Sequence, residues 1–190
     1  MQNLLLTIEL IPESTFFKSL HNFYKYHSNG SIEDWQRIKK KLRVLEGDQC
    51  WICGAEGGRL EAHEFYEFEF YEGKPLQNLM GIHHLCKKCH MVKHFEFWMS
   101  KGYDKKELVE HFCKVNKCSE EIFDKHKIEA VAAWREKNKF KWSVNLMELL
   151  RWSCGFEFEG RKDGSTEIRF PTEEEFEETR KIRLNQLGLN

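Results

Sequence analysis

Apolar residues recur along this chain with two different spacings, and the spacing predicts the local structure. In residues 13–47 they fall three or four positions apart, which places them on one face of a helix. We expect two helices there, the first capped by Ser14 and the second by Ser31. The buried stripe of the second helix is predicted to be Trp35, Ile38, Leu42 and Leu45. Before them, Leu4, Leu6 and Ile8 alternate with other residues, which favours a short strand that ends at Pro12.

The middle of the chain predicts two strands followed by a helix. Residues 59–65 and 79–85 are extended in character, and the turn residues at 72–75 lie between them. Residues 87–101 carry apolar side chains at helical spacing, and Gly102 is expected to end that helix.

The second half of the chain predicts packing helices and then a smaller appendix. Asp104 and Ser119 are candidate caps of two helices, and alternating apolar residues from Phe140 to Leu146 favour a strand. Residues 156–170 predict a β-hairpin, and Thr172 with Glu175 forms the capping box of a last helix. The fold class is therefore α+β. We divide it into an N-terminal strand and helices (1–47), a core (48–102), a helical packing region (103–150) and a hairpin–helix appendix (151–190).

Composition narrows the class of protein. The chain has 190 residues, 41% of them hydrophobic, which suffices for one packed core. It has no apolar run of the roughly 18 residues that cross a membrane, and its start lacks the pattern of a signal peptide. Its seven cysteines are an odd number, and four of them form CxxC pairs, so we expect metal ligation in a reducing, cytoplasmic compartment. The net charge of −1 means that any contact with nucleic acid must be local.

Two CxxC pairs carry the strongest chemical signal in the sequence. Two cysteines three positions apart can present both sulfurs to one ion from a tight turn, and a second such pair completes a tetrahedral zinc site. The ligands we predict for a structural Zn²⁺ are Cys50, Cys53, Cys86 and Cys89. The remaining cysteines, which we interpret as small hydrophobic residues of the core, are Cys113, Cys118 and Cys154.

Three histidines share the same segment and predict a second metal site. His90 and His94 are four residues apart on the predicted helix, so they lie on one face, one turn from each other. Two solvated histidines would be the ordinary interpretation of this spacing. His63, on the strand that the cysteines hold nearby, makes a shared divalent ion the better one.

The combination of these motifs resembles the HNH (ββα-metal) endonucleases of the four-cysteine zinc type. The residues that carry the resemblance are CxxC at 50–53, Leu-Glu-Ala-His-Glu at 60–64, and Cys-Lys-Lys-Cys-His-Met-Val-Lys-His at 86–94. Weaker similarity to uncharacterised bacterial and phage HNH proteins extends to residues 79–82, to the turn at 115–117 and to Trp142. The resemblance implies a zinc-stapled ββα core and metal-dependent hydrolysis of phosphodiester bonds in DNA.

The resemblance also implies roles for individual residues. His63 would be the general base that takes a proton from water, and His90 and His94 would be ligands of a catalytic Mg²⁺, Mn²⁺ or other divalent ion. The family often has an acid or histidine immediately before the base, where this chain has Ala62. Either Glu64 supplies a ligand or base function beside His63, or His63 is the ligand and Glu64 the base.

Basic residues near the motif are candidates for binding DNA, which we expect to be double-stranded. They are Arg37, Lys40, Lys41, Lys87 and Lys93. A solvated helix face is the other interpretation of the basic run at 37–43. The appendix is expected to dock on the core, on a second copy of the chain or on a protein partner. The alternative to an endonuclease is a zinc-stabilised nucleic-acid- or protein-binding module that has lost the chemistry.

Overall fold

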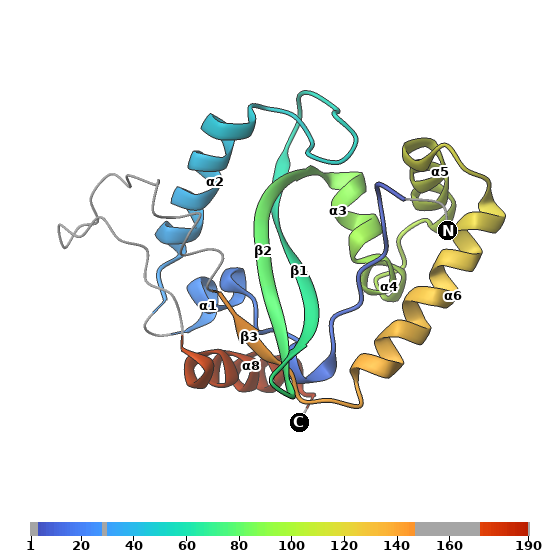
Figure 1. Cartoon of the computed structure of the whole chain (residues 1–190). Coiled ribbons are helices and arrows are strands. Elements are labelled where there is room, and N and C mark those ends of the chain that lie inside the picture. The colour runs from blue at the N-terminus through green and yellow to red at the C-terminus, as the bar shows by residue number, and fades with distance from the viewer. Residues whose placement is uncertain (1–3, 28–29, 147–171, 190) are drawn as a thin grey trace. The chain divides into compact units, whose positions relative to one another are not determined.

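The computed structural model describes residues 4–27, 30–146 and 172–189, and in these it is a mixed α+β protein. Helices accompany a three-stranded sheet with the order β1-β2-β3 (Figure 1). The hairpin predicted at 156–170 and Cys154 lie outside the described residues. Within the described ranges, no helix combines the length and the apolar character that crossing a bilayer requires.

A long β-hairpin forms the middle of the chain. Strand β1 (Leu60–Tyr71) and strand β2 (Lys74–Cys86) are neighbours in the sheet (Figure 1). The two residues between them, Glu72 and Gly73, have φ values of 48° and 77°. Positive φ at both central positions is the requirement of the tight turn whose twist matches two antiparallel strands. Both strands are longer than the predicted ranges of 59–65 and 79–85.

The segment after the hairpin is helical, as predicted, but it forms two helices instead of one. Helix α3 (Lys87–Lys93) starts directly at the end of β2, with Cys86 as its N-cap residue. Helix α4 (Phe95–Ser100) follows it. The break is at His94, whose φ of −103° and ψ of 38° are not helical. A single helix over 87–101 was therefore wrong at this residue, which ends one helix and begins the other.

The chain divides into two compact units that interleave in sequence. One consists of Met1–Pro12, Glu46–His63 and His83–Phe140, and the other of Glu13–Leu45, Glu64–Ile82 and Lys141–Asn190. This division follows spatial contacts and differs from our four consecutive segments. Both hairpin strands contribute residues to each unit.

The first unit is built around packed helices. Helix α3 contacts α5 (Lys105–Asn116), which contacts α6 (Glu120–Lys137). Asp104 caps α5 as predicted, because its carboxylate accepts the N–H of Lys106 at 2.8 Å. The core includes the buried ring of Phe123, which lies against Phe95 and Phe112 with centroids 5.2 and 5.1 Å away.

The N-terminal residues 4–12, here called the N-terminal strap, form neither a helix nor a strand. Side chains take the place of a neighbouring strand: the amide of Asn116 accepts the N–H of Leu6 at 3.0 Å and donates to its carbonyl at 2.8 Å. The N–H of Ile8 donates to Nε2 of His126 at 2.9 Å. The prediction of a strand was wrong, because the apolar alternation reflected burial of Leu6 and Ile8 and not sheet pairing.

The second unit contains the 3-10 turn η1 (Glu13–Thr15) and helices α1 (Leu20–Tyr26) and α2 (Ile32–Glu46), the last of which ends in the first unit. Ser19, and not the predicted Ser14, caps α1. The hydroxyl of Ser14 instead accepts the N–H of Trp142, and Phe17 has a positive φ that no helix tolerates. In α2 the predicted stripe is buried except for Leu45, which is 57% exposed.

Helix α8 (Glu173–Leu187) completes the second unit. Its predicted capping box of Thr172 and Glu175 is confirmed. It contacts α1, and the ammonium of the buried Lys18 lies 2.5 Å from Glu173 and 2.9 Å from Glu177. The predicted strand before it is confirmed in shorter form as β3 (Ser143–Asn145), which pairs in parallel with residues 76–78 of β2.

Candidate metal centres

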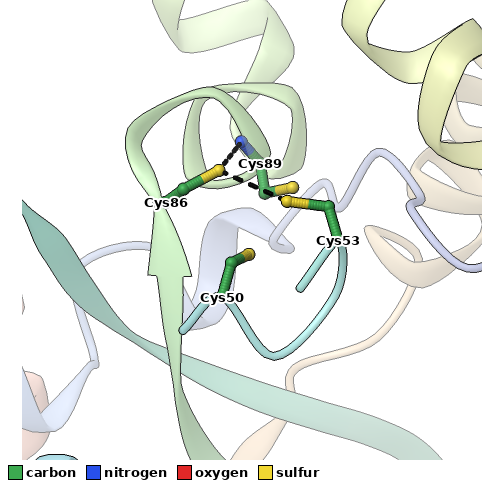
Figure 2. Close-up of side chains that lie close together, drawn as sticks. All are labelled: Cys50, Cys53, Cys86 and Cys89. Carbon is green, nitrogen blue, oxygen red and sulfur yellow. Dashed lines mark hydrogen bonds between the residues drawn. The ribbon is translucent and has the colours of Figure 1, made fainter. Parts of the chain in front are cut away.

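The four cysteines of the CxxC pairs meet in the first unit. Cys50 and Cys53 come from the loop before β1, and Cys86 and Cys89 come from the end of β2 and the start of α3, with all four side chains directed toward one another (Figure 2). Their sulfur atoms all lie within 4.8 Å of one another. The clustering predicted from the CxxC spacing is therefore confirmed.

The spacing of the sulfurs fits a tetrahedral zinc ion. With Zn–S bonds of about 2.3 Å, the sulfurs of such a site lie roughly 3.8 Å apart. Sγ of Cys53 and Sγ of Cys86 lie 3.8 Å apart (Figure 2). The hydrogen bond between Cys50 and Cys86 lowers the pKa of Cys50 and raises that of Cys86 to about 11. Because four adjacent thiolates repel one another, a divalent cation is what allows all four to ionise.

Backbone hydrogen bonds hold the first CxxC pair in a position from which both sulfurs can reach one ion. The N–H of Gly54 donates to the carbonyl of Cys50 at 2.9 Å, and the N–H of Cys50 donates to the carbonyl of Ala55 at 2.9 Å, so the loop closes on itself. The N–H of Trp51 reaches the carbonyl of His84 in β2 at 2.8 Å. These bonds hold the first CxxC pair against the strand that leads into the second.

A histidine from outside the motif reaches the same cluster. Nε2 of His111, in α5, lies 3.2 Å from Sγ of Cys89. An imidazole N–H that donates to a ligating sulfur orients the ligand and offsets part of its negative charge. Sequence reasoning missed His111, since it is 22 residues from Cys89 and lies on what the periodicity presents as a packing helix.

The three histidines of the motif also meet in the first unit. One ring nitrogen from each of His63, His90 and His94 lies within 4.8 Å of the other two. The ring centroid of His63 is 5.3 Å from that of His90 and 4.9 Å from that of His94. The structure thus brings the three histidines together, as predicted: His63 lies in β1, His90 in α3 and His94 at the break between α3 and α4.

Burial favours the uncharged form of two of these rings, His63 and His94. It lowers the pKa of His63, although the hydrogen bond with Glu9 acts in the opposite direction. It also lowers the pKa of His94 to about 3. Neutral imidazole is the form that ligates a metal or accepts a proton. The cluster is therefore suited to both tasks near neutral pH.

A carboxylate from the N-terminal strap completes the surroundings of His63. Oε2 of Glu9 lies 3.0 Å from Nε2 of His63, and Oε1 of Glu9 lies 2.5 Å from Nζ of Lys93. Burial alone would raise the pKa of Glu9, but the bond with His63 and the charge of Lys93 lower it to about 2. Glu9 lies 54 residues before His63, in a stretch that the sequence pattern predicted to be a strand. No sequence motif therefore indicated it.

A second carboxylate faces His90. Oε2 of Glu61 lies 2.7 Å from Nδ1 of His90, an ion pair when the imidazole is protonated. A carboxylate oxygen and an imidazole nitrogen this close together can also ligate one cation jointly. Glu61 precedes His63 by two residues, so strand alternation places both on the same face.

Glu64 has different surroundings. Its carboxylate accepts the N–H groups of Leu20 and His21, each at 3.2 Å, and the hydroxyl of Tyr66. Burial raises the pKa of Glu64 despite these bonds. In the structure this side chain binds the backbone at the start of α1 in the second unit. It is not part of the group of three histidines. Of the two predicted catalytic residues, only His63 belongs to the histidine cluster.

The predicted DNA-binding residues have mixed outcomes. Lys93 is only 3% exposed, and its ammonium is bound to Glu9 and to Thr7, so its predicted contact with DNA is corrected to an internal ion pair. Lys87 and Lys40 are exposed, as a DNA contact requires. Arg37 is paired with Asp34 at 3.2 Å, and Lys41 is half-buried. The α2 residues and Lys87 belong to different units, and each remains a separate candidate.

Comparison with models of protein families, with curated proteins and with solved structures finds no significant match to this chain. The chemistry must therefore be argued from the two clusters themselves.

Proposed function

We propose that this protein is a metal-dependent endonuclease of the HNH class that hydrolyses phosphodiester bonds in DNA. The observation that supports the proposal most directly is the convergence of His63, His90 and His94 beside a four-cysteine cluster. The sequence resemblance implies a strand histidine beside helix histidines where a β-hairpin meets a helix; here His63 lies in β1, His90 in α3 and His94 at the end of α3. The two clusters divide the work, one holding the fold and the other performing the chemistry.

In this proposal the four cysteines hold a structural zinc ion. The ion would join the loop before β1 to the start of α3, and the backbone bond from Trp51 to His84 ties the same loop to β2. The position of His90 depends on this junction, because it directly follows Cys89 in the sequence. The zinc would thus fix the position of His90 in the histidine cluster and take no part in the reaction.

His90 and His94 would hold the catalytic Mg²⁺, Mn²⁺ or other divalent ion, and Glu61 faces the same point from β1. Such an ion, when bound, supplies Lewis-acid stabilisation of the charge that develops on the phosphate and on the leaving oxygen. The two imidazoles and the carboxylate of Glu61 would form a mixed nitrogen and oxygen donor set, which suits several divalent ions.

His63 is the general base in this assignment. Its buried, neutral imidazole can accept a proton from the water that attacks phosphorus, and the proton then rests on the ring. The alternative assignment, with His63 as ligand and Glu64 as base, has less support. The carboxylate of Glu64 already accepts two backbone N–H groups and a tyrosine hydroxyl in the second unit.

A binding module without catalytic activity is the second candidate, and one observation favours it. The exposed side chains of β1 include Glu67 and Glu69, and Glu72 is exposed in the turn that follows. Acidic residues on a strand of the hairpin repel a phosphate backbone, which a nuclease must approach closely. A module that binds a protein partner would not meet this repulsion.

Cleavage of supercoiled plasmid DNA in Mg²⁺ or Mn²⁺ separates the two candidates. The wild-type protein is expected to cleave, and His63→Ala to lose cleavage while it keeps its zinc and its circular dichroism spectrum. His83→Ala is the matched control, because His83 lies in β2 against Trp51 and outside the histidine cluster. Equal cleavage by His63→Ala and wild type would refute the proposed catalytic site.

A further inference from the structure

The contact between Glu9 and His63 joins the N-terminal strap to the histidine cluster. Glu9 is held at three points: its backbone N–H donates to the carbonyl of Lys93 at 2.9 Å, and its two carboxylate oxygens face Lys93 and His63. Its side chain is 25% exposed, whereas those of His63 and Lys93 are 4% exposed each. A partly buried carboxylate with both oxygens engaged has one fixed orientation.

The protons in this contact can be assigned from the geometry. The ammonium of Lys93 donates to Oε1 of Glu9, and a carboxylate paired with a cation acts only as an acceptor. Oε2 must therefore accept from His63, so Nε2 of the imidazole carries the proton. In a neutral imidazole with a proton on Nε2, the basic lone pair is on Nδ1.

We propose that Glu9, braced by Lys93, is a positioning residue that holds His63 in the Nε2–H tautomer with Nδ1 as its basic nitrogen, an inference that rests on the proposed nuclease function. A carboxylate that accepts a hydrogen bond from a catalytic histidine fixes both the orientation and the tautomer of the ring. The N-terminal strap supplies this carboxylate, although it is far from the motif in sequence. The residue immediately before His63 is Ala62. Glu9 does not touch the substrate in this account and acts only through His63.

The test is the tautomer of His63, observed by long-range ¹H–¹⁵N correlation spectra of zinc-loaded protein with no other divalent ion added. Wild-type protein is expected to show His63 protonated on Nε2. In Glu9→Ala the expected result is a mixture of tautomers at His63. His126 is the internal control, because its Nε2 accepts the N–H of Ile8 in the same strap and its proton must be on Nδ1.

Cleavage kinetics supply the second readout. Removing an orienting partner of this kind typically costs about 10- to 100-fold in activity. We expect Glu9→Ala to lower kcat by that factor with an unchanged KM, and Glu9→Gln, which keeps a neutral acceptor oxygen and the side-chain shape, to lose less. Glu136→Ala, an exposed glutamate of α6 paired only at the surface with Lys139, serves as the matched control and should behave as wild type.

Each outcome decides one point. An unchanged His63 tautomer in Glu9→Ala would overturn the positioning role, whatever the activity. A change at both His63 and His126 would also overturn it, because it would show that Glu9 merely keeps the strap in place. Wild-type protein that cleaves no DNA would refute the proposed function, and the tautomer would still decide whether Glu9 orients His63.

Discussion

Sγ of Cys53 and Sγ of Cys86 lie 3.8 Å apart, although 33 residues and a whole β-hairpin separate them in the chain. This separation is the one that a tetrahedral zinc ion imposes on two of its sulfur ligands. The two ends of the hairpin are thereby brought to one point, where α3 begins with Cys86 as its N-cap. The stability of the first unit is expected to depend on this junction.

Replacing one of these cysteines should unfold the first unit. Binding of structural zinc contributes on the order of 10 kcal/mol to folding in small domains, which is comparable to the whole stability of a typical domain. We expect Cys53→Ser to lose its zinc, measured by elemental analysis, and its cooperative thermal transition. Cys113→Ser, at a half-buried cysteine outside the cluster, should keep both. Full zinc content in Cys53→Ser would contradict this account.

The contact of His111 with Cys89 predicts a graded effect on zinc. His111→Ala removes the imidazole 3.2 Å from the sulfur but leaves all four ligands. Zinc affinity should fall about 10- to 100-fold, the usual effect of losing a group that orients a metal ligand. Competition with a coloured chelator measures it. Glu110→Ala, at the preceding and exposed position of α5, is the control, and equal affinities in the two variants would exclude a role for His111.

The hydrogen bond between Ile8 and His126 predicts that the attachment of the N-terminal strap depends on pH. Burial lowers the pKa of His126 below its ordinary value of 6.5. The imidazole therefore binds a proton less readily in the folded protein than in the unfolded chain. Its stabilising contribution is therefore complete above about pH 6.5 and is lost as the pH falls below that value. Protonated Nε2 can no longer accept the N–H of Ile8.

Hydrogen exchange of the Ile8 amide measures this effect. After correction for the intrinsic rate, protection should be lower at pH 5 than at pH 7.5 in the wild-type protein. In His126→Ala it should be low at both. A wild-type protection factor that does not change with pH would show that His126 does not control the strap.

The placement of Glu64 predicts that it matters for stability and not for catalysis. Glu64→Ala would leave the N–H groups of Leu20 and His21 without their acceptor, at a cost of about 1–3 kcal/mol for each buried group. Thermal unfolding should show a clearly lower Tm. Below that temperature, the rate of DNA cleavage per folded molecule should equal that of wild type. Loss of cleavage in a folded Glu64→Ala would restore the assignment of Glu64 as base.

Sequence patterns were most informative where one interaction dominates locally. The CxxC spacing predicted the cluster of sulfurs, and the spacing of His90 and His94 predicted that they share a face with each other. Capping chemistry located the starts of α5 and α8, because a single side chain beside the backbone decides them. Within each CxxC pair, between His90 and His94, and at each cap, residues that are close in sequence are also close in space.

Predictions failed where distant residues decide the local structure. Ser14 has the chemistry of a cap, but its hydroxyl accepts the N–H of Trp142 instead. Lys93 lies within the motif and was predicted to contact DNA, but Glu9 and Thr7 bind its ammonium inside the first unit. His111 could not be found at all, since no local signal marks a contact made by helix packing.

The central claim is that the chain holds a second divalent ion at its three histidines, apart from the ion of the four cysteines. Titration of zinc-loaded protein with Mn²⁺, followed by electron paramagnetic resonance, counts that ion directly. We predict one bound Mn²⁺ per wild-type chain and none in a folded, zinc-loaded variant with both His90→Ala and His94→Ala. Wild-type protein that binds no Mn²⁺, or a double variant that binds it equally well, would contradict the account.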